Sequence, residues 1–403
     1  MSKMKDYKFE HLYEISSGLS STKDQAGHGA PFLSFSSVFN NFFLPDTLSD
    51  KMDTSSEEQE RYSIKEGDIF LTRTSETLDE LAMSSVAVKD YPHATYSGFL
   101  KRLRPTQTDI TYAKFMAFYL RSSYFRKIID NNATMTLRAS FNEDIFSWLH
   151  LMLPDYNEQK KIGDWLYVLD SKIKNNQRVI VTLESMAKTL YDYWFVQFDF
   201  PNDNGHPYKT SGGKMEWNET LSREIPVGWE VQKVGSLIKK QKSIKSIERK
   251  NYSSNGKYPI VDQSIEYIAG YTNDEVNALG DEDSIIIFGD HTRILKYVDF
   301  PFVIGADGTQ RIVSKNKERM PQVLFYYSLA RIDLSNYGYA RHYKFLKDSM
   351  IVVPPKDVAR HFDMQVKFWR HIISKKIREN RYLEELRDFI LPMLMNGQVT
   401  FRQ

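Results

Sequence analysis

The stretch PDYNEQK, Pro154 to Lys160, holds the clearest set of residues that could do chemistry. Asp155, Glu158 and Lys160 match the letters of the PD…ExK motif, in which paired carboxylates hold a metal ion for phosphodiester hydrolysis. In that motif the acids come from separate strands that converge on the metal. Here the two acids lie three residues apart, where a helix is expected to begin, and acids at a helix start complement the helix dipole. We therefore interpret them as helix-start residues rather than as a nuclease site.

Other catalytic motifs are absent from the sequence. It contains no Walker phosphate loop, no GxSxG, no HExxH and no GxGxxG after a strand. Its nine His residues lack metal-ligand spacing, and without Cys it has no disulfide, thiolate zinc site or Cys nucleophile. The Pro-Pro pair in VVPPKD lacks the preceding polar residue and the aromatic residue of an adenine-methylating loop. We predict that the chain does no covalent chemistry and holds no metal or cofactor.

The bulk composition predicts a globular chain of more than one domain. A length of 403 residues suggests two or three domains, each with its own core. The sequence shows neither an apolar signal segment nor a run of membrane-spanning length, so we expect a cytoplasmic protein without a membrane partner. The net charge is small, 54 − 52 = +2, but residues 236–251 carry six Lys or Arg against one Glu.

Two long helices of similar layout are predicted 200 residues apart. LPDYNEQKKIGDWLYVLDSKIKNN, from Leu153, and VPPKDVARHFDMQVKFWRHIISKK, from Val353, coincide when the sequence is shifted against itself. Each continues as an a/d heptad seam with alternating four- and three-residue steps. The first seam comprises Ile162, Leu166, Leu169, Ile173, Asn176, Ile180, Leu183, Ala187, Leu190 and Trp194, and the second comprises Phe362, Val366, Trp369, Ile373, Lys376, Asn380, Leu383, Arg387, Ile390 and Leu394.

These seams predict that the two helices pack on each other as an antiparallel coiled coil. Each would run about 50 Å at 1.5 Å per residue, too long to be buried by one small domain. The pair would then act as a spacer between two globular domains, with Asn176 helping to fix its register. The alternative is that each helix is an ordinary amphipathic element packed on its own domain.

The segments before the two helices also resemble each other. EGDIFLTRTSET and DSIIIFGDHTRIL each predict a strand running into a polar turn with Thr-Arg, followed by a short helix and a strand that leads into the long helix. We predict an α+β fold with a pseudo-twofold internal repeat. The expected segments are a first domain at 1–153, a central helix at 154–200, a linker or open loop rich in Asn, Gly, Pro and Ser at 201–229, a second domain at 230–353 and a C-terminal helix at 354–403.

Four stretches resemble conserved parts of the specificity subunits of type I restriction–modification systems. LPDYNEQKKI resembles the start of their central helix and TLESMAKTLYDYWFVQFDF its end. SREIPVGWEVQKVGSL resembles the start of their second half, and LRDFILPMLMNGQV resembles their C-terminal conserved region. The stretches occur in the order expected for that family, along the whole chain.

The resemblance implies that the two α+β domains are target recognition domains, each reading one half of a split sequence in double-stranded DNA. It implies that the conserved helices hold the domains apart and dock two modification subunits, which bind S-adenosylmethionine and methylate adenine. Restriction subunits would join through that assembly. This chain would then be the non-catalytic specificity subunit of the complex. Two reading domains on a spacer suit half-sites about one DNA turn, ~34 Å, apart.

Candidate DNA contacts follow from side-chain chemistry, because the recognition domains are the variable part of the family. Arg, Lys, Gln, His and Thr side chains in loops after strands can bind phosphates or base edges. In the first domain the candidates are Arg73, Thr74, Ser75, Lys101, Arg102 and Arg104. In the second they are Lys239 and Lys240, which suit backbone phosphates, and His291, Arg293, Asp307, Gln310, Arg341, His342 and Lys344. Solvated strand faces and plain surface loops are the alternatives.

Two other classes of protein remain open. A fragment of a single-chain restriction–methylation enzyme would need methylase motifs that the sequence lacks. A coiled-coil scaffold, or a DNA-binding protein without a restriction–modification role, would leave the conserved stretches unexplained.

Overall fold

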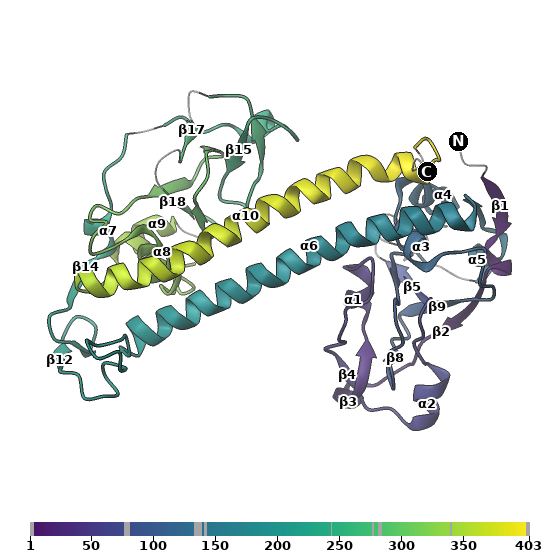
Figure 1. The fold of residues 1–403 in the computed structure, drawn as a ribbon, viewed down its shortest axis with the longest axis horizontal. Coiled ribbons are helices and arrows are strands. Elements are labelled where there is room, and N and C mark those ends of the chain that lie inside the picture. Colours follow the sequence, from purple (N-terminus) through teal and green to yellow (C-terminus); the bar gives the residue numbers. More distant parts are fainter. Residues whose placement is uncertain are drawn as a thin grey trace. The chain divides into compact units, whose positions relative to one another are not determined.

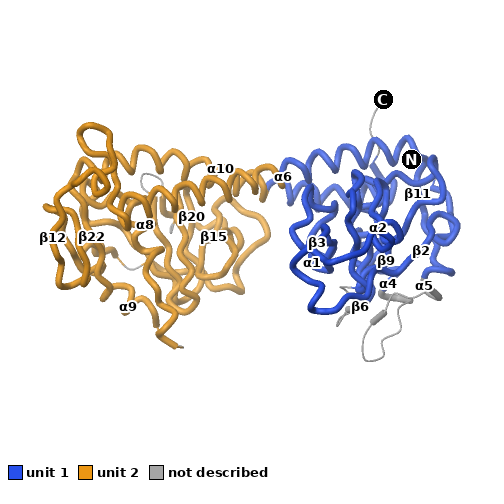
Figure 2. The backbone as a smooth tube through the Cα atoms, turned by 90° about the horizontal axis from the view of Figure 1, so that it is seen from below, with its two compact units in different colours: residues 1–173, 382–403 blue, residues 174–381 orange. Residues whose placement is uncertain are grey.

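A computed structural model describes residues 4–75, 81–132, 139–140, 143–242, 244–275, 278–280, 284–338 and 341–399. The chain forms two compact units, unit 1 from residues 1–173 and 382–403 and unit 2 from residues 174–381 (Figure 2). Two long helices, α6 (Tyr156–Tyr191) and α10 (Lys356–Met395), each have one end in unit 1 and the other in unit 2. The helices are therefore shared between the units, whereas the predicted boundaries treat them as separate segments.

Unit 1 is built around the buried strand β5. The sequence IFLT makes every β5 side chain apolar or hydroxyl, and all four residues are buried between antiparallel neighbours β7 and β9. Helix α3 shares a core with this sheet through Phe115 and Phe118. The strands of unit 1 are β1 (Lys5–Lys8), β2 (Tyr13–Ser17), β3 (Ala26–Leu33), β4 (Lys51–Met52), β5 (Ile69–Thr72), β6 (Thr74–Ser75), β7 (Ser84–Val86), β8 (Thr95–Tyr96), β9 (Leu100–Pro105), β10 (Ala139–Ser140) and β11 (His150–Leu153), and its short helices are α1 (Phe35–Phe39), α2 (Ser56–Arg61), α3 (Ala113–Tyr119), α4 (Ser123–Asn132) and α5 (Glu143–Trp148).

Unit 2 has a comparable buried strand, β18, with the sequence IIIFG. It lies between antiparallel neighbours β19 and β21. The strands of unit 2 are β12 (Met215–Asn218), β13 (Arg223–Pro226), β14 (Glu230–Lys233), β15 (Tyr258–Val261), β16 (Gly270–Thr272), β17 (Ala278–Leu279), β18 (Ile285–Gly289), β19 (Leu295–Val298), β20 (Phe302–Ile304), β21 (Thr309–Ile312) and β22 (Met350–Val353), and its short helices are α7 (Val234–Leu237), α8 (Gln322–Ala330) and α9 (His342–Asp348).

The strand pairings repeat from one unit to the other. Strand β5 with its neighbours β7 and β9 corresponds to β18 with β19 and β21, and the parallel pair β3–β8 corresponds to β15–β20. Each unit also pairs its opening strand with the strand that leads into a long helix, β1 with β11 and β14 with β22. This order of elements, visible in Figure 1, confirms the predicted α+β class and internal repeat.

In unit 2 the two long helices pack in opposite directions. The rings of Trp194, just after α6, and Phe362 are 5.9 Å apart, and Asn176 Nδ2 donates to Asn380 Oδ1 at 2.8 Å. Both pairs have the same residue-number sum, 194 + 362 = 176 + 380 = 556, as antiparallel pairing in one register requires. In unit 1, Ile162 and Leu394 share the core. All seam residues named above are buried or half-buried.

The start of α6 is packed closely on α3 in unit 1. A Cβ atom at Gly163 would lie 2.6 Å from the Phe115 backbone nitrogen, so only glycine permits this approach. Asp164 accepts hydrogen bonds from Tyr112 at 2.6 Å and from Lys114 at 2.9 Å. The helix is therefore fixed to unit 1 by both packing and polar contacts.

Residues 201–229, predicted as a linker or open loop, are instead folded onto unit 2. Strands β12 and β13 form an antiparallel hairpin. The ring of Phe200 stacks on Tyr208 at 4.6 Å and packs on Trp229 at 5.2 Å. Burial of these aromatic rings in the core outweighs the loop preference of the Gly, Pro and Asn residues between them.

Across the described residues, no helix combines the length and the apolar character needed to cross a membrane.

Candidate nucleic-acid interface

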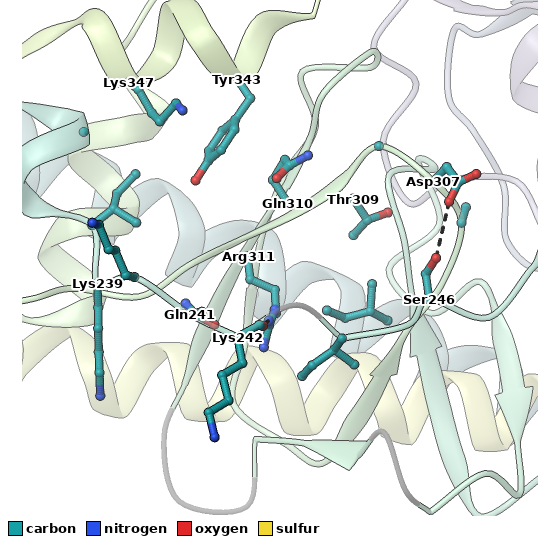
Figure 3. A pocket seen from close by; sticks show the side chains of 17 residues that line it. Lys239, Gln241, Lys242, Ser246, Asp307, Thr309, Gln310, Arg311, Tyr343 and Lys347 are labelled. Atoms are coloured by element: carbon teal, nitrogen blue, oxygen red, sulfur yellow. Dashed lines mark hydrogen bonds between the residues drawn. The ribbon is translucent and has the colours of Figure 1, made fainter.

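A basic pocket lies on the surface of unit 2 (Figure 3). It measures about 470 Å³ and is walled by residues 238–242 with Ile244 and Ser246, by β21 with the loop before it, and by α9. Four predicted residues line it, Lys239, Lys240, Asp307 and Gln310. The fold brings them together because Lys239 N donates to Val313 O at 2.8 Å, so that the lysine-rich segment runs beside β21.

The pocket is strongly cationic. Five basic side chains and one acidic side chain line it: Lys239, Lys240, Lys242, Arg311 and Lys347 against Asp307. The first three lysines are exposed, and within the described part of the chain none of them forms an ion pair. Burial lowers the pKa of the Arg311 guanidinium, which donates to the backbone oxygen of Lys242. Cations crowded without local neutralisation form a surface suited to an anionic ligand such as a nucleic-acid backbone.

Of the pocket cations, Lys242, Arg311 and Lys347 are not among the predicted residues. Lys242 belongs to the basic run at 236–251, so it could have been predicted from the sequence. Arg311 and Lys347 could not have been predicted from the sequence. They reach the pocket only because β21 pairs with β18 and because α9 docks there.

Three loops of unit 2 meet at the side chain of Gln263. Its Nε2 donates to Asp307 O at 2.7 Å, and its Oε1 accepts from His291 N at 3.2 Å. The Thr292 hydroxyl donates to Gln263 O at 2.7 Å. The predicted residues His291 and Asp307 therefore lie in one connected loop surface at the pocket rim, and both side chains are exposed.

Other predicted residues of this unit lie close by in the fold. Arg293 follows β18 and is exposed with a left-handed backbone, φ 62°, while its Nη1 donates to Leu334 O at 3.3 Å. Arg341 precedes α9, and both Arg341 and Lys344 are exposed. Tyr343, also on α9, lines the pocket.

His342 has a structural role instead. It is 3% exposed, and its Nδ1 and Nε2 lie 3.0 Å from the backbone oxygens of Asp290 and Tyr337, respectively. The Asp290 side chain in turn accepts from Tyr343 N at 2.8 Å. His342 thus joins α9 to the loop after β18 and cannot reach a ligand without leaving the core.

In unit 1, Arg73 occupies the position that corresponds to Asp290. Its backbone N–H donates to Phe99 O at 2.9 Å, as that of Asp290 donates to Gly308 O at 2.8 Å. The Arg73 side chain is exposed, and Phe99 beside it is 65% exposed. The backbone of Thr74 and Ser75 forms β6, paired with β10, while their side chains lie outside the described part of the structure.

The basic residues of β9 are held inside unit 1. Lys101 and Arg102 are each 6% exposed; Lys101 Nζ donates to Ser17 Oγ at 2.9 Å and Arg102 donates to Ser63 O at 2.7 Å. Arg104 forms two hydrogen bonds with Asp68, at 2.8 and 2.6 Å, which raise the pKa of its guanidinium. These three predicted DNA contacts are occupied within the fold, and the interface proposed below does not use them.

The acidic stretch before α6 behaves as a helix start. Asp155 Oδ1 accepts a hydrogen bond from Glu158 N at 3.0 Å, which satisfies a backbone donor at the helix N-terminus. Among the residues that the structure describes, no group of three or more His, Asp or Glu side chains could hold a metal ion.

Comparisons with known proteins identify relatives over most of the chain. The sequence profile of the type I restriction modification DNA specificity domain matches residues 1–185. The chain is 24% identical over 336 residues to the type I restriction enzyme MjaIX specificity subunit of Methanocaldococcus jannaschii, which covers 78% of this chain and 74% of that protein. It is 29% identical over 211 residues to the type I restriction enzyme HindI specificity subunit of Haemophilus influenzae, covering 49% of this chain and 42% of that protein.

A solved structure has the same fold. The S subunit of the type I restriction–modification system from M. genitalium superposes with a TM-score of 0.64 at 16% identity. The superposition covers 98% of this chain and 96% of that one. Both units and both long helices are therefore shared with a known fold.

Proposed function

Because this chain belongs to the family of type I restriction–modification specificity subunits, we propose that it reads a two-part target in double-stranded DNA, one part with each unit. The basic pocket of unit 2 is the observation that carries the proposal. Its exposed lysines bind backbone phosphates and place the loops around Gln263 over the bases. In unit 1 the corresponding loops offer Arg73 for a guanine edge.

Base reading is assigned to polar side chains in and next to the loops around the pocket. In unit 2 these are the exposed His291, Arg293 and Arg341 and the half-buried Gln310, which lines the pocket. Phosphate contacts fix the position of the protein on the duplex, whereas contacts with base edges select the sequence. A scaffold without a DNA role would have no use for a cluster of unneutralised lysines, which repel one another.

Partner docking is assigned to the outer face of α10. Met364 and Phe368 in unit 2 are 56% and 65% exposed, and Tyr382 and Phe389 in unit 1 are 65% and 71% exposed. Each lies two residues after a seam position, on a helix face that is normally polar. Met364 and Phe368 lie one helical turn apart and Tyr382 and Phe389 two turns apart, and apolar side chains repeated along one helix face mark protein contacts. We assign one modification subunit to each pair.

In this assembly the modification subunits bind S-adenosylmethionine and transfer the methyl group to adenine. Restriction subunits join through the modification subunits. The specificity chain contributes DNA selection and no catalytic group of its own.

The pocket lysines provide the test. In the complex of the full chain with its modification subunits, Lys239→Ala with Lys242→Ala should weaken binding to target and non-target DNA alike. Loss of two phosphate contacts should reduce the slope of log K against log salt by about 2. The control is Lys209→Ala with Lys214→Ala, which removes the same charge from exposed positions outside the pocket. Anisotropy titrations at several salt concentrations measure the slope, and an unchanged slope in the pocket variant contradicts the proposal.

A further inference from the structure

Ile265 has the largest exposed fraction, 85%, among the large apolar side chains that the structure describes. It lies in unit 2, in the loop between β15 and β16. A single exposed apolar residue is ordinary on a protein surface and needs no explanation by itself. Ile265 differs from such residues because hydrogen bonds fix the loop that carries it.

The side chain of a buried lysine binds the backbone of this loop. Lys296 on β19 is 4% exposed, and its Nζ donates to the backbone oxygens of Asp262, at 2.8 Å, and of Glu266. Burial lowers the pKa of Lys296 to about 8, against the opposing effect of Asp262 and Glu266. Since burying a lysine opposes folding, its use here indicates a loop whose shape matters.

Residues on both sides of Ile265 are fixed in place. Asp262 Oδ1 accepts from Ser264 N at 2.9 Å and from Ser264 Oγ at 2.5 Å, and Asp262 Oδ2 accepts from the Tyr252 hydroxyl at 3.1 Å. The backbone of Glu266 is held by Lys296. The loop is therefore preorganised, and the Ile265 side chain projects from a fixed frame into solvent.

The surroundings of Ile265 are those of the proposed DNA surface. Gln263, two residues before it, donates to Asp307 O, and Asp307 lies on the rim of the basic pocket in Figure 3. Gln263 also accepts from the backbone of His291. An apolar side chain on a loop that contacts the rim of a cationic pocket suits the groove of a DNA duplex, where phosphates flank base edges. In the major groove, thymine alone among the four bases presents a methyl group.

We propose that Ile265 contacts the 5-methyl group of a thymine in the half-site read by unit 2 and so helps to determine the sequence. The inference rests on the proposed function. Preorganisation of the loop means that little conformational entropy is lost when the contact forms.

Deoxyuridine tests this contact, because it pairs as thymine does but lacks the 5-methyl group. The target is first mapped from methylated adenines, and each of its thymines is then replaced in turn by deoxyuridine. For the wild-type complex with its modification subunits, one replacement should weaken binding roughly fourfold, the effect of burying one methyl-sized group. Ile265→Ala should bind the unmodified target roughly fourfold more weakly and should be indifferent to that replacement.

Val227→Ala is the matched control, since Val227 is 50% exposed on unit 2 and does not line the pocket. It should retain wild-type affinity and wild-type sensitivity to deoxyuridine. The thymine contact is wrong if the wild-type complex binds its target but no deoxyuridine replacement weakens that binding. It is also wrong if Ile265→Ala loses as much affinity on replacement as the wild type does. In both cases the proposed reading of DNA by this chain is unaffected. If the wild-type complex shows no sequence-specific binding, the proposed function fails together with this inference.

Discussion

Arg104 and Asp68 form an ion pair that ties β9 to the residue before β5 in unit 1. Asp68 is 1% exposed in its side chain and Arg104 25%. Asp68 also accepts from Lys65 N at 2.8 Å, so the carboxylate organises the turn that leads into the buried strand. A partly buried pair of this kind is retained because either charge alone would be costly inside the fold.

Removing Arg104 should therefore act on stability. Arg104→Ala leaves the Asp68 carboxylate buried without its partner and should lower the free energy of unfolding by about 3 kcal/mol, the lower end for a buried pair. Asp68→Asn with Arg104→Met removes both charges and should recover most of that loss. Urea unfolding measures both variants. A stable Arg104→Ala protein with weakened DNA binding would instead place Arg104 in the interface.

The residues of β9 also show why candidate contacts could be predicted only in part. Basic residues in GFLKRLRP suggest an exposed strand, but all of Leu100 to Leu103 are buried because β9 is covered on both faces. In contrast, Lys239 and Lys240 lie in a run with so much like charge that it could only be exposed. A long lysine-rich run without large apolar stretches was therefore informative, whereas basic residues interspersed with leucines in β9 were not.

At the scale of elements, the long helices were predictable because their seams repeat over many turns. The short strands around β5 and β18 were predictable as well, since both are continuous apolar runs. The pairing of Asn176 with Asn380 was not, because each helix shows only its own polar position. Nor was the folded segment 201–229, whose Phe200, Tyr208 and Trp229 are separated by residues typical of loops.

The Asn pair should fix the register of the two helices. Asn176 and Asn380 are 0% and 7% exposed, so Asn176→Leu removes a buried hydrogen bond and should cost about 1–3 kcal/mol. Replacing both residues with Leu should restore stability while weakening the preference for one register. A double-mutant cycle by urea unfolding should give a coupling energy of at least about 0.5 kcal/mol. Strictly additive effects would show that the pair does not act together.

At the scale of the whole molecule, the two shared helices are proposed to set the DNA spacing. One heptad inserted after Ile173 in α6 and one after Arg381 in α10 keeps the seam in phase, at the boundary between the units. It adds about 10 Å of helix, or about three base pairs at ~34 Å per turn. An insertion in one helix alone should mainly destabilise the protein, because its seam residues lose their partners. A folded, active, doubly extended protein that keeps the original spacer would show that the helices do not set it.

Independent reading by the two units is the central claim. Its test exchanges residues 1–153 for the first domain of another family member, so that the β1–β11 pairing stays within one donor sequence. Methylated adenines are then mapped across the genome of cells that carry either protein with the modification subunits. We predict that one half of the target changes while the other half and the spacer stay the same. A change in both halves, or a target that is not split, would contradict the account.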